Sequence, residues 1–258
     1  MFNTFLKTIA DRLGFEVRRK PAVPYEYQRQ AAAAIAVVAP YTMLPWERLV
    51  TLYQKVAFCE QASVVGDLVE CGVWKGGAVA LMALANLVEG RQRRHIHLFD
   101  SFQEICAPDS AVDGAQAVRE AQRHGSDCNG QLRPVTGIYD SVGGPGTLAG
   151  NRRLLEEIVG YDSRFLHYHA GWFQETMPRE TAQIGPVAIL RLDGDWYAST
   201  KICLEHLYDK VVSGGFVIID DYGAYEGCRR AVDEFLADRG IKAFLHSDDR
   251  VCRYWIKP

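Results

Sequence analysis

The sequence predicts an α/β protein with a largely parallel β-sheet and helices on both faces. From residue 66 onward, short apolar or β-branched runs alternate with helical patterns, which is typical of such a sheet. The last two runs, 243–246 and 251–256, are separated only by polar residues. They predict a terminal hairpin, so one strand must run antiparallel to the rest. The length of 258 residues, with 48% hydrophobic residues, suits one well-packed domain or at most two small ones.

The beginning of the chain predicts a helical arm. Apolar residues recur at helical spacing over residues 2–13, and Pro21 and Pro24 end the arm. We expect this helix to dock on its own domain or on a second subunit, and contact with a membrane is the alternative. The expected division is an N-terminal helical arm and lid over residues 1–60 and one α/β domain over residues 61–258.

The α/β domain is expected to contain the following elements in order. The predicted strands before the hairpin are residues 67–71, 95–99, 165–169, 187–192 and 216–219. The predicted helices are residues 78–88, 152–159, 200–208 and 228–239. Residues 103–150 are rich in Gly, Asp, Ser and Pro, and we expect a mobile insertion there.

Composition and charge disfavour several classes of function. The 29 Lys and Arg residues against 32 Asp and Glu give a formal net charge of −3, so nothing points to nucleic acid. The longest apolar stretch near the beginning is too short to span a bilayer, and no secretory signal is present. The seven cysteines lie far apart without a CxxC pair. We expect a cytoplasmic protein with reduced thiols and neither a nucleic-acid nor a membrane partner.

A glycine turn after the first strand is the main cofactor signal. Gly72, Gly76 and Gly77 lie between that strand and the next helix. Glycine permits a tight turn and close approach of a ligand, and the helix N-terminus offers free N–H groups. Asp100 follows at the end of the next strand, where a carboxylate can accept hydrogen bonds from ribose hydroxyls. Together these residues predict an adenosine-containing cofactor.

The charge of Glu70 favours S-adenosylmethionine (SAM) over NAD. The glycine spacing departs from the GxGxxG pattern of dinucleotide-binding proteins, and Glu70 stands two positions before the first glycine. A carboxylate there would repel a pyrophosphate, whereas it suits the ammonium and sulfonium groups of SAM.

Carboxylates also cluster at the ends of two further strands. Asp193 and Asp195 follow the strand at 187–192, while Asp220 and Asp221 follow the strand at 216–219. Carboxylates that converge at the ligand-binding edge of a sheet repel one another unless a cation neutralises them. Oxygen ligands suit Mg²⁺, with Mn²⁺ or Ca²⁺ as alternatives, and capping of the following helices is the competing interpretation. A cation would ease deprotonation of a substrate hydroxyl, for which a free carboxylate can serve as general base.

Four histidines occur in alternating pairs on two of the predicted strands. His167 and His169 alternate on one predicted strand, and His95 and His97 on another. Each pair therefore faces one side of the sheet. Ordinary packing or cofactor contact is favoured over a two-histidine metal site, because no third ligand has suitable spacing.

Five segments together resemble the macrocin and mycinamicin O-methyltransferases. They are YTML at 41–44, LVECGVWKGG at 68–77, AGWFQETMP at 170–178, LRLDGDWYAST at 190–200 and GGFVIIDDYGAYEGCRRAVDEF at 214–235. The resemblance covers roughly residues 41–102 and 160–240. It implies a class I SAM-dependent methyltransferase (Rossmann-like) fold, with seven strands in the order 3-2-1-4-5-7-6. It also implies dependence on Mg²⁺, methylation of a sugar hydroxyl on a natural product, and usually a homodimer.

The resemblance further implies roles for individual residues. The residues that match the family's cofactor contacts are Thr42 and Met43 in a lid over SAM, Glu70 and Gly72 at its methionine end, Asp100 and Ser101 at its ribose, and Gly171 and Trp172 near its adenine. Those that match its metal site are the ligands Asp193, Asp220 and Asp221, with Asp195 as the proposed general base.

One segment departs from the family pattern. After residue 102 the family usually continues with an EGLP-like turn, whereas this chain reads QEIC and enters the insertion. Because this region would border the acceptor pocket, the identity of the acceptor does not transfer. A metal-dependent catechol- or phenol-type O-methyltransferase is the alternative function. A non-catalytic SAM-binding partner protein is disfavoured, because the metal set and the candidate base are complete.

Overall fold

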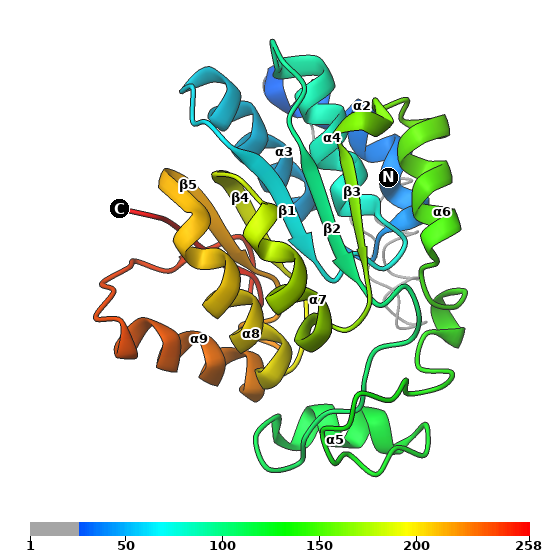
Figure 1. The fold of residues 1–258 in the computed structure, drawn as a ribbon. Helices are drawn as coiled ribbons and strands as arrows, with labels where there is room; N and C mark the ends of the chain where they lie inside the picture. Colours follow the sequence, from blue (N-terminus) through cyan, green and yellow to red (C-terminus); the bar gives the residue numbers. More distant parts are fainter. Residues whose placement is uncertain (1–25) are drawn as a thin grey trace, which may run out of the picture.

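The computed structural model describes residues 26–258, and a seven-stranded mixed sheet forms its centre (Figure 1). The strands are β1 (Asp67–Cys71), β2 (Ile96–Asp100), β3 (Leu166–Ala170), β4 (Val187–Leu192), β5 (Val211–Ile219), β6 (His246–Ser247) and β7 (Arg253–Ile256). Their order is β3-β2-β1-β4-β5-β7-β6, with β7 antiparallel to both of its neighbours. This order confirms the predicted class I methyltransferase fold. The arm helix predicted at residues 2–13 lies outside the described residues.

Helices cover both faces of the sheet. They are α2 (Glu26–Val38), α3 (Trp46–Gln61), α4 (Gly77–Glu89), α5 (Gly114–Gln122), α6 (Leu148–Arg152), α7 (Phe173–Glu180), α8 (Tyr197–Leu207) and α9 (Glu226–Asp238). In Figure 1, α7, α8 and α9 lie in front of the sheet and α2, α3 and α4 lie behind it. After α6 the chain continues as a π-helix, η3 (Arg153–Ile158).

Alternation of side chains along the strands divides the core into two clusters. On β1, Leu68 packs in the cluster with α2, α3 and α4, whereas Val69 packs in the cluster with α7, α8 and α9. Phe216 and Val217 on β5 divide in the same way. Helices α2 and α3 therefore share one apolar core with the sheet. No helix among residues 26–258 is both long enough and apolar enough to cross a bilayer.

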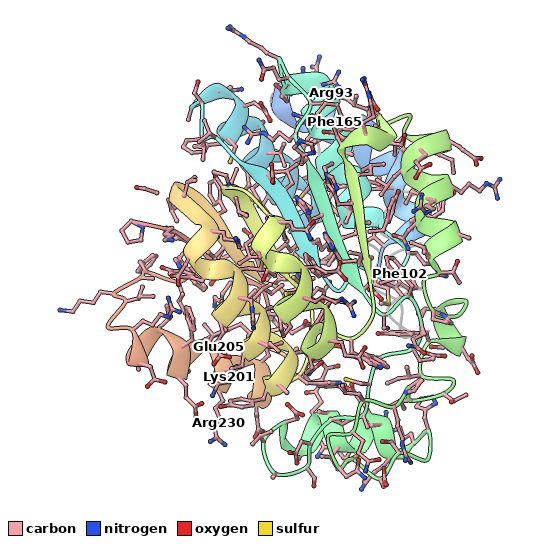
Figure 2. The ribbon with its side chains drawn as sticks, in the orientation of Figure 1. Arg93, Phe102, Phe165, Lys201, Glu205 and Arg230 are labelled. Carbon is pink, nitrogen blue, oxygen red and sulfur yellow. The ribbon has the colours of Figure 1, made fainter. Side chains whose placement is uncertain are left out.

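The carboxyl ends of the parallel strands all lie at the same edge of the sheet. Figure 2 shows Arg93 and Phe165 at the amino end and Phe102, which follows β2, at the opposite end. Lys201 and Glu205 lie on α8 and Arg230 lies on α9, on the helices that cover one face of the sheet. Figure 1 shows α5 and the rest of the insertion beyond the carboxyl edge. The insertion contains a helix that the sequence pattern did not reveal, packed on the small apolar cluster of Ala107, Ala121, Cys128 and Val135.

Four histidines form a hydrogen-bonded ladder on β3 and the β2 segment. His95 Nδ1 lies 2.8 Å from His167 Nε2, and His97 Nδ1 lies 3.1 Å from His169 Nε2. The ring of His97 stacks on that of His167 at 4.5 Å. Among the described residues, three or more potential ligand side chains gather tightly enough for a metal ion only at Asp193, Asp195 and Asp221. The structure therefore places the histidines in sheet packing.

Acidification is expected to destabilise the protein through His167. Burial and the charges of the neighbouring histidines lower the pKa of His167 from 6.5 to about 4. Between these two values the unfolded chain binds more protons than the folded protein, so stability falls as pH decreases. A His167→Gln variant should show a weaker decrease in Tm from about pH 6.5 to about pH 4. Parallel Tm curves for the two proteins would show that His167 is not responsible.

Candidate active site

A cavity of about 560 Å³ opens at the carboxyl edge of the sheet. The ends of β1, β2, β4 and β5 line it, together with the segment before α3 and part of the insertion. The wall includes every residue to which the family resemblance gives a role at the cofactor or the metal: Thr42, Met43, Glu70, Gly72, Asp100, Ser101, Gly171, Trp172, Asp193, Asp195, Asp220 and Asp221. The topology therefore brings together, in a single site, residues that lie far apart between positions 42 and 221 of the chain.

The glycine positions in the turn after β1 leave no room for a side chain. Gly72 has φ +86°, and a Cβ there would overlap the carbonyl oxygen of Asp193 on the neighbouring segment. Gly76 has φ +82° and precedes α4. A Cβ on Gly77 would lie 2.5 Å from the carbonyl oxygen of Tyr41 and 2.6 Å from the Cβ of Thr42. Glycine thus allows the segment of Tyr41 and Thr42 to approach the N-terminus of α4 closely.

Asp100 ties the end of β2 to the glycine turn. Its Oδ2 accepts hydrogen bonds from the amides of Val73 at 2.7 Å and Trp74 at 3.1 Å, and its Oδ1 accepts one from Phe102 at 2.6 Å. Burial raises the pKa of Asp100, and these three backbone donors counteract that rise. A carboxylate has about four acceptor positions, so Asp100 retains capacity for a ribose hydroxyl.

Glu70 carries an unsatisfied acceptor at the base of the cavity. One oxygen, Oε1, pairs with the buried guanidinium of Arg191. The other, Oε2, is buried without a hydrogen-bond partner. Burial raises the pKa of Glu70 to about 8 despite the charge of Arg191. A buried acceptor without a partner costs about 1–3 kcal/mol, and a cationic N–H donor such as the ammonium of SAM would satisfy it. The site fits this cofactor.

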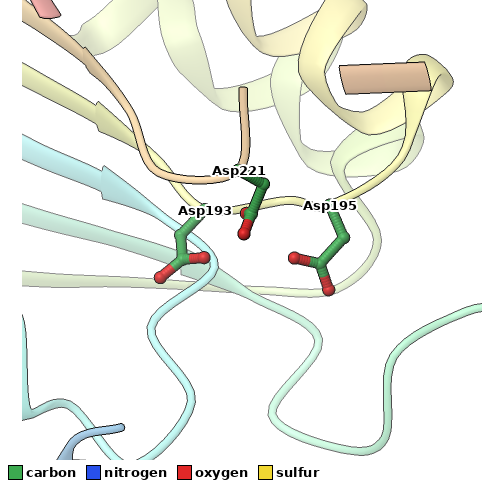
Figure 3. A group of neighbouring side chains, drawn as sticks. All are labelled: Asp193, Asp195 and Asp221. Carbon is green, nitrogen blue, oxygen red and sulfur yellow. The ribbon is translucent and has the colours of Figure 1, made fainter. Parts of the chain in front are cut away.

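Three carboxylates converge in the same cavity (Figure 3). Asp193 and Asp195 after β4 and Asp221 after β5 each offer an oxygen, and these oxygens lie within 4.8 Å of one another. Asp221 Oδ2 is buried without a partner. Burial and the charge of Asp193 raise the pKa of Asp195 to about 7, while burial and the charge of Asp195 raise that of Asp221 well above its usual range. An all-oxygen set with this unrelieved repulsion fits a hard divalent cation.

Helix capping does not explain these acids. The amide of Tyr197 at the start of α8 donates to Asp113 Oδ1 at 2.6 Å, so a residue of the insertion occupies the position considered for Asp195. No side chain caps α9 at Tyr225. The competing interpretation from the sequence is therefore wrong for both Asp195 and Asp221.

Asp220 has different partners from the other three aspartates. Its Oδ1 accepts from Arg191 and its Oδ2 from Arg48, both at 2.6 Å. Arg191 also pairs with Asp193 Oδ2 at 2.9 Å. The structure thus brings Asp193, Asp195 and Asp221 together, and it directs Asp220 towards two arginines.

The sequence analysis did not identify either arginine. Arg191 interrupts the apolar run VAILRL of β4 and is 2% exposed. Burial alone would lower its pKa, but Asp220, Glu70 and Asp193 raise it well above the usual value. A lone charge in a buried strand is a usable signal, because such a residue needs an ionic partner. Arg48 lies on α3 and gives no such signal, since exposed arginines are common on helices.

The insertion forms the remaining wall and is anchored to the strand ends. Trp196 Nε1 donates to the carbonyl oxygen of Cys106 at 2.8 Å. Tyr225 donates through its hydroxyl to Glu120 Oε2 on α5 at 2.7 Å. These contacts join the insertion to the segments that follow β4 and β5.

The sheet order, the glycine turn, and the acidic cavity at the carboxyl edge define a class I SAM-dependent methyltransferase. The sequence profile of the family described as Macrocin-O-methyltransferase (TylF) matches residues 3–127 and 156–257. The chain belongs to this family and is a SAM-dependent O-methyltransferase, which confirms the resemblance seen in the sequence.

Individual relatives support the assignment. The chain is 38% identical over 220 residues to demethyldecarbamoylnovobiocin O-methyltransferase of Streptomyces niveus, covering 83% of this chain and 75% of the relative. It is 33% identical over 234 residues to mycinamicin III 3''-O-methyltransferase of Micromonospora griseorubida, covering 89% and 83%. The solved structure of the O-methyltransferase NovP superimposes with a TM-score of 0.67 at 34% identity, over 84% of this chain and 82% of that one.

Proposed function

We propose that the protein transfers the methyl group of SAM to a sugar hydroxyl on a natural product, with Mg²⁺ as its metal ion. The observation that carries the proposal is the convergence of Asp193, Asp195 and Asp221 in the same cavity as Glu70 and Asp100. The relatives named above are O-methyltransferases of demethyldecarbamoylnovobiocin and mycinamicin III, which supports a natural-product acceptor. A third relative, from Streptomyces olivaceus and 35% identical over 218 residues, is named as the 4'-O-methyltransferase of a rhamnosyl-tetracenomycin C, which supports a glycosylated acceptor. The family resemblance also favours a homodimer, with residues 1–60 serving as arm and lid.

The cofactor half of the cavity would hold SAM between β1 and β2. Glu70 is placed to accept from the ammonium group and Asp100 from the ribose, with Gly171 and Trp172 near the adenine and Thr42 and Met43 above it. Bound SAM supplies an electrophilic methyl group on its sulfonium. The cavity's contribution is to align the acceptor oxygen with this methyl group and to exclude water.

The acidic half of the cavity would activate the acceptor hydroxyl. We assign Asp193 and Asp221 as metal ligands, with Asp220 completing the set through the acceptor positions that its two arginines leave free. A divalent cation at these carboxylates would lower the pKa of a nearby hydroxyl. Asp195 then accepts the hydroxyl proton as general base.

A methyl-transfer assay after complete removal of divalent cations tests this proposal. Demethyldecarbamoylnovobiocin and mycinamicin III, the acceptors named for the relatives, and methyl α-L-rhamnoside are incubated with SAM. Mass spectrometry then detects transfer of one methyl group. We expect turnover to be lost on chelation and restored by Mg²⁺.

A binding measurement separates loss of catalysis from loss of the cofactor site. Calorimetric titration with S-adenosylhomocysteine should show binding with and without Mg²⁺, and NADH should give no response. Full turnover in the chelated protein would disprove the metal assignment. Binding of NADH without S-adenosylhomocysteine would overturn the cofactor assignment.

A further inference from the structure

Residues 128–155 form a wall of the cavity that the family match does not include. The matched regions end at residue 127 and resume at residue 156. Between them, Ile138, Tyr139, Ser141 and Val142 line the cavity. The cavity therefore contains side chains that the family match does not cover.

This wall is fixed to the glycine turn of the cofactor site. Trp74 Nε1 donates to the carbonyl oxygen of Gly144 at 3.2 Å, and Lys75 Nζ donates to that of Val142 at 2.8 Å. Asn151 Nδ2 donates to the carbonyl oxygen of Trp74 at 2.8 Å. The turn is thus held from both ends of the segment, so side chains on the wall have defined positions relative to the cofactor.

Two polar side chains of this wall, Tyr139 and Ser141, have no hydrogen-bond partner among residues 26–258, and Tyr139 is the less exposed of the two. Its ring contacts that of Trp74, with 6.3 Å between centroids. Its hydroxyl makes no hydrogen bond to any other residue in the described range 26–258, whereas the hydroxyls of Tyr197, Tyr222 and Tyr225 each donate to a carboxylate. A ligand that accepts a hydrogen bond from such an unpaired hydroxyl binds more tightly because of that bond.

Tyr139 lines the same cavity as Asp100, Asp193 and Asp195. Burial raises its pKa well above the usual value, and the charges of Asp195, Asp100 and Asp193 raise it further. The phenol therefore stays protonated at neutral pH and remains a hydrogen-bond donor. The cavity that Tyr139 lines thus also contains the carboxylate assigned to the ribose and the carboxylate assigned as general base.

We propose that Tyr139 binds the acceptor, donating a hydrogen bond from its hydroxyl to a sugar oxygen adjacent to the hydroxyl that is methylated. Residues 128–155 then form a specificity wall that lies outside the family match. This inference rests on the proposed sugar methylation, and it assigns recognition of one further oxygen of the sugar to a residue outside the family match.

Kinetics of a Tyr139→Phe variant test the assignment. The substitution removes one oxygen and keeps the ring against Trp74. With the best acceptor among demethyldecarbamoylnovobiocin, mycinamicin III and methyl α-L-rhamnoside, we expect KM for the acceptor to rise about 2- to 13-fold, the effect of one hydrogen bond. The Kd of S-adenosylhomocysteine should remain within about twofold, and kcat should change less than KM. Tyr168→Phe is the matched control. Tyr168 lies on the edge strand β3 outside the cavity, and its hydroxyl donates a hydrogen bond to Glu156.

Deoxy analogues of the same acceptor sharpen the test. The analogue that lacks the oxygen bound by Tyr139 should bind more weakly to the wild-type protein and lose nothing further in Tyr139→Phe. Unchanged acceptor KM in Tyr139→Phe, with wild-type turnover intact, would overturn this inference and leave the proposed function standing. Absence of wild-type turnover with all three acceptors would overturn both.

Discussion

Asparagine in place of Asp195 is expected to lower kcat by about 10²–10⁴-fold, the usual contribution of a positioned general base. Asp195 lies among the converging carboxylates, and burial raises its pKa to about 7, within reach of a proton transfer near neutral pH. Asparagine keeps the size of the side chain and cannot accept the proton. Single-turnover methyl transfer measures the effect without interference from product release.

A matched Asp220→Asn variant separates the general base from a metal ligand. We expect Asp195→Asn to retain Mn²⁺ affinity in calorimetric titration, whereas Asp220→Asn loses part of it. Asp193→Asn should lose both Mn²⁺ binding and turnover while it still binds S-adenosylhomocysteine. Loss of Mn²⁺ binding in Asp195→Asn, with full retention in Asp220→Asn, would exchange the two roles. The convergence of Asp193, Asp195 and Asp221 makes this comparison necessary.

Methionine in place of Arg191 is expected to reduce the free energy of unfolding by about 3–5 kcal/mol, the penalty for removing one partner of a buried ion pair. The guanidinium contacts Glu70, Asp193 and Asp220, and its side chain is 2% exposed. Methionine fills a similar volume without a charge, so the carboxylates are left to repel one another. Urea denaturation at neutral pH measures the change, with the slope of the transition as a check on two-state unfolding.

Arg179→Met provides the control for loss of an arginine as such. Arg179 pairs with Glu180 on the surface, and its side chain is 63% exposed. Such pairs contribute about 0–1 kcal/mol, so this variant should unfold close to the wild-type midpoint. Equal destabilisation by the two substitutions would show that the buried ionic network does not depend on Arg191.

Regular elements could be predicted where local pattern alone determines them. Strands β1 and β4 begin and end at the predicted residues, because each is a continuous buried run bounded by polar residues or glycine. Strand β5 begins at Val211, five residues before the prediction. Its pairing with β4 shifts register between Val187 and Ile189, and the Gly214-Gly215 pair concealed the earlier part of the strand. Glycine inside a strand commonly marks such an irregularity.

The site could be located from the sequence, but its ionic partners could not. Carboxylates at the carboxyl ends of parallel strands meet at one edge of the sheet, and this does not depend on the conformation of the loops. All twelve candidate residues line one cavity there. Their individual roles remain predictions. The pairing of Asp220 with Arg48 depends on how α3 packs beside the sheet, across 172 positions of the chain. No local pattern encodes such a contact. The same limitation applies to α5, whose small apolar face is buried by other parts of the insertion and by Trp196 after β4.

The contact between Asp113 and α8 divides the insertion into parts of different evolutionary freedom. Asp113 accepts from the amide of Tyr197, two residues after Asp195, and a Cβ on Gly227 would have to push it aside. A substitution of Asp113 would remove this contact and shift the backbone that carries Asp195. The stretch from 128 to 150 makes no such contact with α8. The stretch is held to the glycine turn through the backbone carbonyl oxygens of Val142 and Gly144, which do not depend on the side chains at those positions. An engineered exchange of acceptor loops between relatives should therefore place its junctions beyond residue 127 and keep these two backbone contacts.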